Sequence, residues 1–409
     1  MIFRDRAVLA LVVSELVSTF GTRLTVVGLP WFVLVTTGSA ARMGFVLAAG
    51  VLPLALFGIP SGALVARFGA RRALLVSDFV RAPLVALIPA LHHVGALSFP
   101  VLLVIVFMLG AAAAPYFASK RLILPELLGE DAPLVAQANS AIEGANRVTA
   151  LLGPVAAGLL IVRLGASSVL WLDGVSFFVS FLLLVLLVPQ RPPLEVDREE
   201  PHGVGAALRF LVRDRLLGGM ALTTVIFGMF WPVLFATLPV LAYQHHSAKL
   251  AGYLFALWGA GTSVGSVLSY NLARRLPQLP LARAAMLGIG APLLTLAFTV
   301  SPWAVGAVLV VSGVFIPITN APFFSMFTLR TPAPLRAQVM TTVTTCEELA
   351  GPIVLTIAGP AIETFGLRPA YVFVAAGGAI AAATFLVATA PRAPARARRP
   401  VPVPRRGRT

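Results

Sequence analysis

Six carboxylates lie within stretches of this chain that are otherwise apolar enough to cross a lipid bilayer. An ionisable side chain at membrane depth costs about 3 kcal/mol or more unless it is paired or faces water, so such groups usually line an ion or substrate pathway. Glu15, Glu347 and Glu348 have no basic residue one helical turn away. Carboxylates in such positions can carry protons or cations. We therefore predict proton-coupling roles for four of the six: Glu15, Glu143, Glu347 and Glu348.

Three arginines, Arg81, Arg147 and Arg23, lie near these acids along the predicted helices and suggest charge pairs. Glu143 and Arg147 stand at positions i and i+4, and Asp78 and Arg81 at i and i+3, so each pair shares a helix face. A structural ion pair and a role in the pathway are equally consistent with Glu143, whereas the structural role is favoured for Asp78. Arg23 lies on the same face as Glu15, nearer the outer side of the membrane.

The composition places these residues in a polytopic membrane protein. The 409 residues are 58% hydrophobic and 11% charged, with a mean hydropathy of +0.92, which excludes an ordinary soluble domain. At about 20 apolar residues per span, the chain predicts an all-α protein with twelve transmembrane helices. The predicted spans are 7–36, 43–66, 72–91, 97–118, 136–162, 166–189, 216–242, 251–273, 281–300, 303–327, 337–362 and 369–390.

Basic residues alternate between the loops and predict the orientation. Of 31 Lys and Arg residues, 23 fall on the side that holds both termini and 4 on the other. Cytoplasmic loops are enriched in Lys and Arg, so both termini are expected in the cytoplasm of a multi-pass cell-membrane protein, with the lipid bilayer as a partner. The net charge of +15 is explained by this placement, and we expect no nucleic-acid partner.

Two halves of the chain resemble each other. Gly44 and Gly252 each open a span at an offset of 208, and Leu164-Gly165 matches Phe365-Gly366 at an offset of 201. A duplicated six-helix unit gives such a pattern. We therefore predict a six-helix bundle at 1–190, a linker at 191–215 with an amphipathic run near 204–213, a second bundle at 216–390 and a basic tail at 391–409.

The loop after the second span carries the most specific motif. It reads G-A-L-V-A-R-F-G-A-R-R and resembles the signature of the major facilitator superfamily, except that Ala66 stands where the family has an acid. The resemblance implies two six-helix bundles that alternate in access, with this loop as a conformational latch. The matching positions are Gly62, Arg67, Gly69, Arg71 and Arg72.

Further motifs resemble the drug-efflux branch of that family, which includes macrolide exporters and mycobacterial multidrug pumps. Gly153-Pro154 followed by Gly158 looks like the fifth-span motif associated with antiport, and small residues also allow close helix packing and bending. The resemblance implies proton-driven export of a small lipophilic organic substrate. An acid is common in the branch where Arg23 stands, so this chain departs from the pattern.

Aromatic, sulfur-containing and hydroxyl side chains form the predicted substrate pocket. Large aromatic residues and Met can line an adaptable apolar site, although packing and lipid contact are the commoner fates of any one of them. Threonines near Glu347 form a polar stripe that would face a cavity or a partner helix. The predicted pocket residues are Trp31, Phe227, Met229, Phe230, Trp231, Thr341 and Thr345.

Other chemistry lacks support in the sequence. A single cysteine, Cys346, and five histidines scattered in loops predict no metal site, and no phosphate-binding loop or nucleophile elbow is present. We expect no cofactor, no enzymatic activity and a monomer. The alternatives left open are uptake by proton symport, export of one secondary metabolite or siderophore, and a membrane-embedded lipid-handling enzyme.

Overall fold

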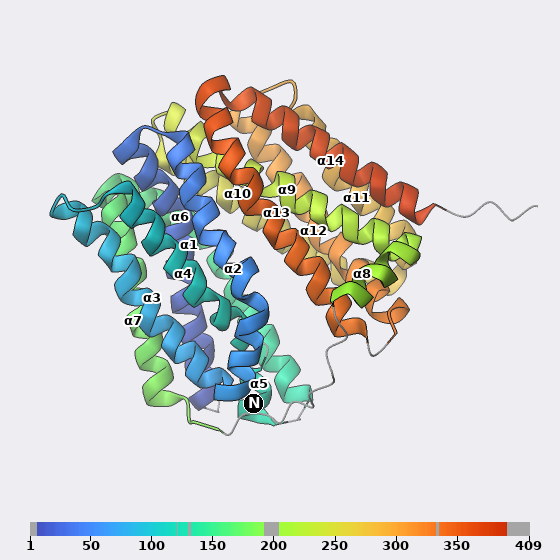
Figure 1. Cartoon of the computed structure of the whole chain (residues 1–409), viewed down its shortest axis with the longest axis horizontal. Coiled ribbons are helices and arrows are strands. Elements are labelled where there is room, and N and C mark those ends of the chain that lie inside the picture. Colours follow the sequence, from blue (N-terminus) through green and yellow to red (C-terminus); the bar gives the residue numbers. More distant parts are fainter. Residues whose placement is uncertain (1–5, 121, 130–131, 192–203, 333–334, 391–409) are drawn as a thin grey trace, which may run out of the picture.

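The computed structural model describes residues 6–120, 122–129, 132–191, 204–332 and 335–390, and these form fourteen helices (Figure 1). The predicted tail and residues 192–203 of the predicted linker lie outside the described residues. The helices are α1 Arg6–Thr37, α2 Ala40–Phe68, α3 Ala70–His93, α4 Phe99–Ser119, α5 Ile123–Leu128, α6 Ala132–Leu164, α7 Ala166–Leu187, α8 Val204–Arg213, α9 Arg215–Gln244, α10 Ala248–Arg275, α11 Gln278–Thr295, α12 Pro302–Arg330, α13 Arg336–Phe365 and α14 Leu367–Thr389.

Twelve of these helices are long, and each corresponds to one of the twelve predicted spans. By length and composition, ten of them are suited to cross a membrane within the described residues. The other two are α11, with 18 residues, and α13, whose apolar character is reduced by Glu347, Glu348 and several threonines. The short α8 coincides with the predicted amphipathic run, whereas α5 was not predicted.

Capping groups and glycines explain where many of the helices begin and end. Ser39 accepts a hydrogen bond from the Arg42 amide at the start of α2, and Asp214 accepts from the Leu216 and Leu217 amides at the start of α9. Single glycines with positive φ join α2 to α3, α6 to α7 and α13 to α14, a conformation that a side chain would strain. These glycines are Gly69, Gly165 and Gly366, with φ of 88°, 84° and 79°.

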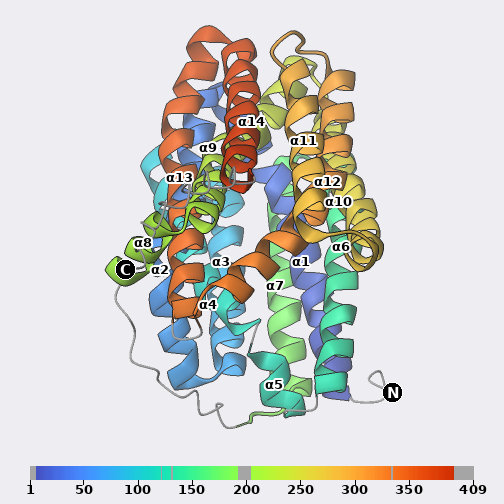
Figure 2. The ribbon, with the colours of Figure 1, turned by 90° about the vertical axis from the view of Figure 1, so that its right-hand side faces the viewer.

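The helices pack as two groups with the same internal arrangement. In the first group α1 packs against α6 and α7, α3 against α4 and α7, and α2 against α4. In the second group α9 takes the place of α1, α10 of α2, α11 of α3, α12 of α4, α13 of α6 and α14 of α7. Figure 1 shows one group on each side of the molecule, and Figure 2 shows their helices running in roughly the same direction.

Two equivalent helix pairs, α2 with α13 and α6 with α10, make the main contacts between the groups. Both contacts contain facing glycines. A Cβ atom added to Gly44 would lie 2.8 Å from the Gly359 Cα, and one added to Gly158 would lie 3.3 Å from the Gly252 Cα. All four glycines lie toward the same end of the molecule, and the groups diverge toward the opposite end, where α5 lies (Figure 1).

Candidate functional site

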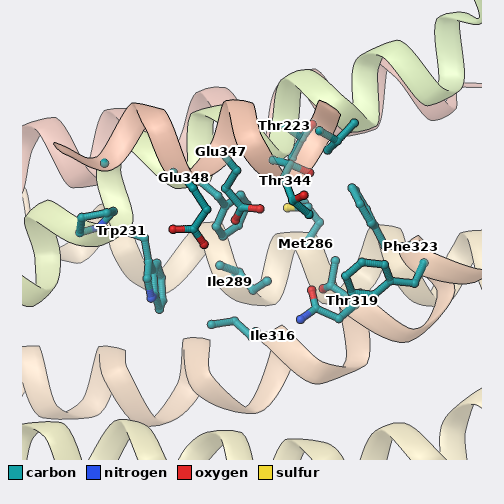
Figure 3. A pocket seen from close by; sticks show the side chains of 18 of the residues that line it. Thr223, Trp231, Met286, Ile289, Ile316, Thr319, Phe323, Thr344, Glu347 and Glu348 are labelled. Carbon is teal, nitrogen blue, oxygen red and sulfur yellow. The ribbon is translucent and has the colours of Figure 1, made fainter. Parts of the chain in front are cut away.

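A cavity of about 320 Å³ lies within the second group of helices. Its walls come from α9, α11, α12 and α13, with Trp258 from α10 and Val51 from α2 (Figure 3). Thr223 near the start of α9 and Phe327 near the end of α12 belong to the lining, so the cavity reaches toward the end at which the groups diverge. Its volume is within the range of small-molecule sites, about 300–1,000 Å³.

Glu347 and Glu348 on α13 supply the charge of this cavity. Both carboxylates line it, and in Figure 3 they project from α13 toward the helices opposite. Neither forms an ion pair or a hydrogen bond with the described part of the chain. Thr344 and Asn320 add neutral polar groups to the wall. The site therefore presents two acids that no basic side chain of the described residues neutralises.

Aromatic rings form an apolar wall of the same cavity. Phe227 and Trp231 stand one turn apart on α9 with ring centroids 6.2 Å apart, and both line the cavity. Trp231 packs edge-on against Phe235 at 5.7 Å, and Phe235 packs against Trp258 at 5.0 Å. Connected rings of this kind form a continuous apolar surface next to the carboxylates.

The structure brings together only part of the predicted pocket. Phe227 and Trp231 line the cavity, and Phe230 is fully buried beside both rings. Trp31 is buried instead against Tyr243, with ring centroids 6.0 Å apart.

The remaining predicted pocket residues, Met229, Thr341 and Thr345, are not among the lining residues, whereas Thr344 is. Successive helical residues point about 100° apart, so an error of one residue in the predicted face selects the wrong threonine.

Glu15 belongs to a separate polar cluster in the first group of helices. Its carboxylate pairs with Lys120 and accepts hydrogen bonds from the Tyr116 hydroxyl at 2.7 Å and the Thr19 hydroxyl at 2.9 Å. These partners of Glu15 are not evident from the sequence, because Tyr116 and Lys120 are 101 and 105 residues away along the chain. Tyr116 and Lys120 lie at the end of α4, and the packing of the first group of helices brings them to Glu15 on α1.

Asp78 and Arg81 extend the same cluster on α3. Their charged atoms are 3.6 Å apart, and Asp78 also accepts a hydrogen bond from Ser180 at 2.6 Å. The Arg81 guanidinium lies over the Phe177 ring at 3.8 Å, a favourable cation–π arrangement. Asp173 on α7 accepts a hydrogen bond from the Thr25 hydroxyl and is buried nearby, and it forms no ion pair within the described residues.

The charged residues of α6, Glu143 and Arg147, and Arg23 of α1 are less buried than the acids of this cluster. Glu143 and Arg147 approach to 3.9 Å, but their side chains are 64% and 42% exposed. Arg147 donates to the Ser266 hydroxyl of α10 at 2.5 Å, which connects the two groups of helices. Arg23 is half-buried, and its Nε has no partner among the described residues.

The small residues of α6 lie at contacts with other helices. A Cβ atom at Gly153 would meet the Arg23 side chain at 2.5 Å, and one at Gly158 would meet the Ala248 carbonyl oxygen at 2.9 Å. Pro154 lies between them, close to Gly252 of α10. The predicted hinge segment is therefore positioned at the interface of α6 with α1 and α10.

The predicted latch loop forms the junction of α2 and α3. Arg67, Arg71 and Arg72 line a surface cavity together with Glu126 of α5, and Gly69 provides the turn. Gly62 is earlier on α2, with open space beside its Cα. Glu126, which the sequence analysis did not single out, accepts hydrogen bonds from the Ala70 amide at 2.9 and 3.1 Å. Burial raises the pKa of the Glu126 carboxyl, and these backbone donors partly oppose that shift.

Within the described residues, no group of three or more His, Cys, Asp and Glu side chains could hold a metal ion.

The fold and the cavity agree with one family of proteins. The model of the Major Facilitator Superfamily matches residues 11–355, so the chain belongs to this family of multi-pass membrane transporters, which are not enzymes. The chain is similar to the multidrug efflux pump Tap of Mycolicibacterium fortuitum, with 28% identity over 382 residues that cover 89% of this chain and 91% of the relative.

Two further similarities bear on the fold and on part of the chain. The enterobactin exporter EntS of Citrobacter koseri is 34% identical over 131 residues, which cover 31% of this chain and 30% of the relative. A mutant of the nucleoside transporter NupG superposes with a TM-score of 0.74 at 12% identity, covering 93% of this chain and 99% of that one. At that identity the NupG structure supports the fold alone.

Proposed function

We propose that this protein is a proton-coupled secondary transporter that exports lipophilic organic compounds from the cell. The observation that carries the proposal is the cavity in which two carboxylates, without an ion pair in the described part of the chain, face a surface of aromatic rings. The rings can bind apolar substrates of different shape, and the acids can exchange protons between the two sides of the membrane. The similarity to a multidrug efflux pump over 89% of the chain supports export of drugs.

The proposed cycle moves two bundles, residues 1–190 and 216–390, against each other around this cavity. With both termini in the cytoplasm, the end at which the bundles meet faces outward and the cavity is reached from inside. In this orientation the transporter would bind substrate from the cytoplasm or the inner leaflet. Closing the inner end and opening the outer end would then release it.

Within this cycle we assign proton exchange to Glu347 and Glu348. Their carboxylates share a cavity with the proposed substrate, so loading a proton and binding a substrate change the same local charge. Glu143 lies at the exposed, inner part of α6 and would act at the entrance. Glu15 is paired with Lys120, so we assign it a structural role in stabilising the first bundle.

Inverted membrane vesicles test this proposal. Lipophilic drugs are added one at a time under an imposed proton gradient, and both drug accumulation and proton release are followed. We expect drug-driven proton release with the unaltered protein and loss of most of it in the double variant Glu347→Gln, Glu348→Gln. Asp214→Asn, which preserves the helix cap on α9, is the control and should export normally.

Two results would contradict the proposal. Export at the normal rate by both Glu143→Gln and the double variant would remove these carboxylates from proton coupling. Drug movement along the proton gradient, rather than against it, would indicate uptake by symport.

A dedicated metabolite exporter is the second candidate. It is favoured by the 34% identity to an enterobactin exporter, although that similarity covers only 31% of the chain. The same vesicle assay separates the two candidates, because a dedicated exporter would release protons for one siderophore-like compound and for none of a panel of unrelated drugs.

A further inference from the structure

A second cavity, distinct from the proposed transport site, lies where α2 and α7 end and α3 begins, on the side of α5. Its volume is about 540 Å³, and four arginines line it together with a single acid. The chain therefore collects a formal charge of about +3 in one small hollow of the surface. The lining residues that matter here are Arg67, Arg71, Arg72, Arg191, Glu126 and Gln190.

These arginines are not neutralised by the described part of the chain. None of the four forms an ion pair there, and the carboxylate of Glu126 is occupied by the Ala70 amide at 2.9 Å. The acid that the family has in this loop is Ala66 here, which removes the usual local counter-charge. Within the described residues the cavity thus keeps a net positive charge, which an anionic ligand would balance.

The four guanidinium groups differ in how many of their donors are already used within the described residues. Arg71 is fixed, because it donates to the carbonyl oxygens of Val188 at 2.6 Å and Val185 at 3.1 Å at the end of α7. Arg72 lies against the neutral amide of Gln190, at 2.7 Å when the amide oxygen faces it. Arg67 and Arg191 have no hydrogen bond within the described residues, so their donors are available to a ligand. Guanidinium groups bind phosphate oxygens with two parallel hydrogen bonds.

Apolar side chains next to the arginines identify the kind of anion. Leu64 and Phe68 on the last turns of α2 are 46% and 45% exposed, Leu64 within the predicted span 43–66 and Phe68 just beyond it. A phosphate group in the cavity would thus have an apolar surface directly beside it. Free phosphate makes no use of that surface, whereas acyl chains can lie along it. Each Lys or Arg near an anionic membrane surface contributes about 1 kcal/mol to attraction.

We propose that this cavity binds the phosphodiester headgroup of an anionic phospholipid from the inner leaflet. Arg67, Arg72 and Arg191 would bind the phosphate, and Arg71 would hold the end of α7 in place behind them. The proposal concerns a site separate from Glu347 and Glu348, so it does not depend on which compound the protein exports.

Lipid binding by the purified full-length protein in detergent tests the proposal directly. Phosphatidylglycerol and phosphatidylcholine are titrated separately, and bound lipid is counted by native mass spectrometry. We expect the unaltered protein to bind phosphatidylglycerol at least tenfold more tightly than phosphatidylcholine. The triple variant Arg67→Gln, Arg72→Gln, Arg191→Gln should reduce this preference to less than twofold.

A matched control removes the same number of charges elsewhere. Arg213→Gln, Arg274→Gln, Arg275→Gln alters three exposed arginines outside the cavity and should keep the tenfold preference. Both variants keep Arg71 and its hydrogen bonds to the end of α7, so both are expected to fold. Thermal unfolding measurements on each variant check this.

Three outcomes would overturn the proposal. An unchanged lipid preference in the cavity variant would show that the arginines do not bind the headgroup. An equal loss in the control would show that overall charge alone matters. Displacement of the lipid by millimolar inorganic phosphate would identify the ligand as free phosphate instead.

Discussion

At the scale of single residues, the acids of this protein fall into two environments that the sequence does not separate. Glu15 has a cation and two hydroxyl donors within hydrogen-bonding range, whereas Glu347 and Glu348 have no partner in the described residues. Depth in a span can be predicted from the position along a helix. A partner on another helix cannot, because it depends on packing between segments about a hundred residues apart.

The environment of Glu15 leads to a stability prediction. Glu15→Gln removes the charge opposite Lys120 and leaves a partly buried ammonium group without its counter-ion. A hydrogen bond to a charged group contributes about 2 kcal/mol, so we expect a clear decrease in the unfolding temperature in detergent. The double variant Glu15→Gln, Lys120→Met should recover much of that loss. Unchanged stability in Glu15→Gln together with abolished export would instead assign proton coupling to Glu15.

At the scale of helices, the apolar pattern of the sequence predicts where the long helices lie. It does not predict which helices of the two halves contact each other. All twelve predicted spans correspond to long helices, and the amphipathic run became α8. The missed element, α5, has only 6 residues and thus too few for a recognisable period. The matched glycines of the two halves were visible in the sequence, but their contacts across the halves, Gly44 with Gly359 and Gly158 with Gly252, were not.

These glycine contacts lead to a prediction about the closed end. Gly158→Val places a branched side chain against the α10 backbone, where even a Cβ atom would lie 2.9 Å from the Ala248 oxygen. Overpacking costs about 1–3 kcal/mol, so the equilibrium population of the closed arrangement relative to the open one should fall by about 5- to 150-fold.

Nitroxide labels at positions 42 and 368, in a Cys346→Ser background, provide the measurement. We expect a new population with a longer distance in Gly158→Val. Gly144→Val is the control, since Gly144 lies on the same helix with nothing within 4 Å of an added Cβ. A distance distribution that is unchanged in Gly158→Val, or changed equally in the control, would contradict the role of this contact.

At the scale of the whole molecule, a polar contact joins the two groups of helices at the end where they meet. Glu363 near the end of α13 accepts hydrogen bonds from the Ser39 hydroxyl at 2.5 Å and the Ala41 amide at 2.8 Å, at the start of α2. A carboxylate at a helix N-terminus satisfies free amides and interacts favourably with the helix dipole. In this arrangement, one group of helices thus caps a helix of the other.

Alternating access requires this contact to break in every cycle, which gives the last prediction. In a Cys346→Ser background, the pair Ser39→Cys and Glu363→Cys should be joined by a short bifunctional thiol reagent, because the native side-chain atoms are 2.5 Å apart. Cross-linking should abolish export, and a reducible cross-linker should allow its recovery after reduction. Each single cysteine variant, treated with the same reagent, controls for modification alone. If the cross-linked protein exported at the normal rate, the two groups of helices would not separate at this end during transport, and the rocking of two bundles would have to be replaced by a movement within one of them.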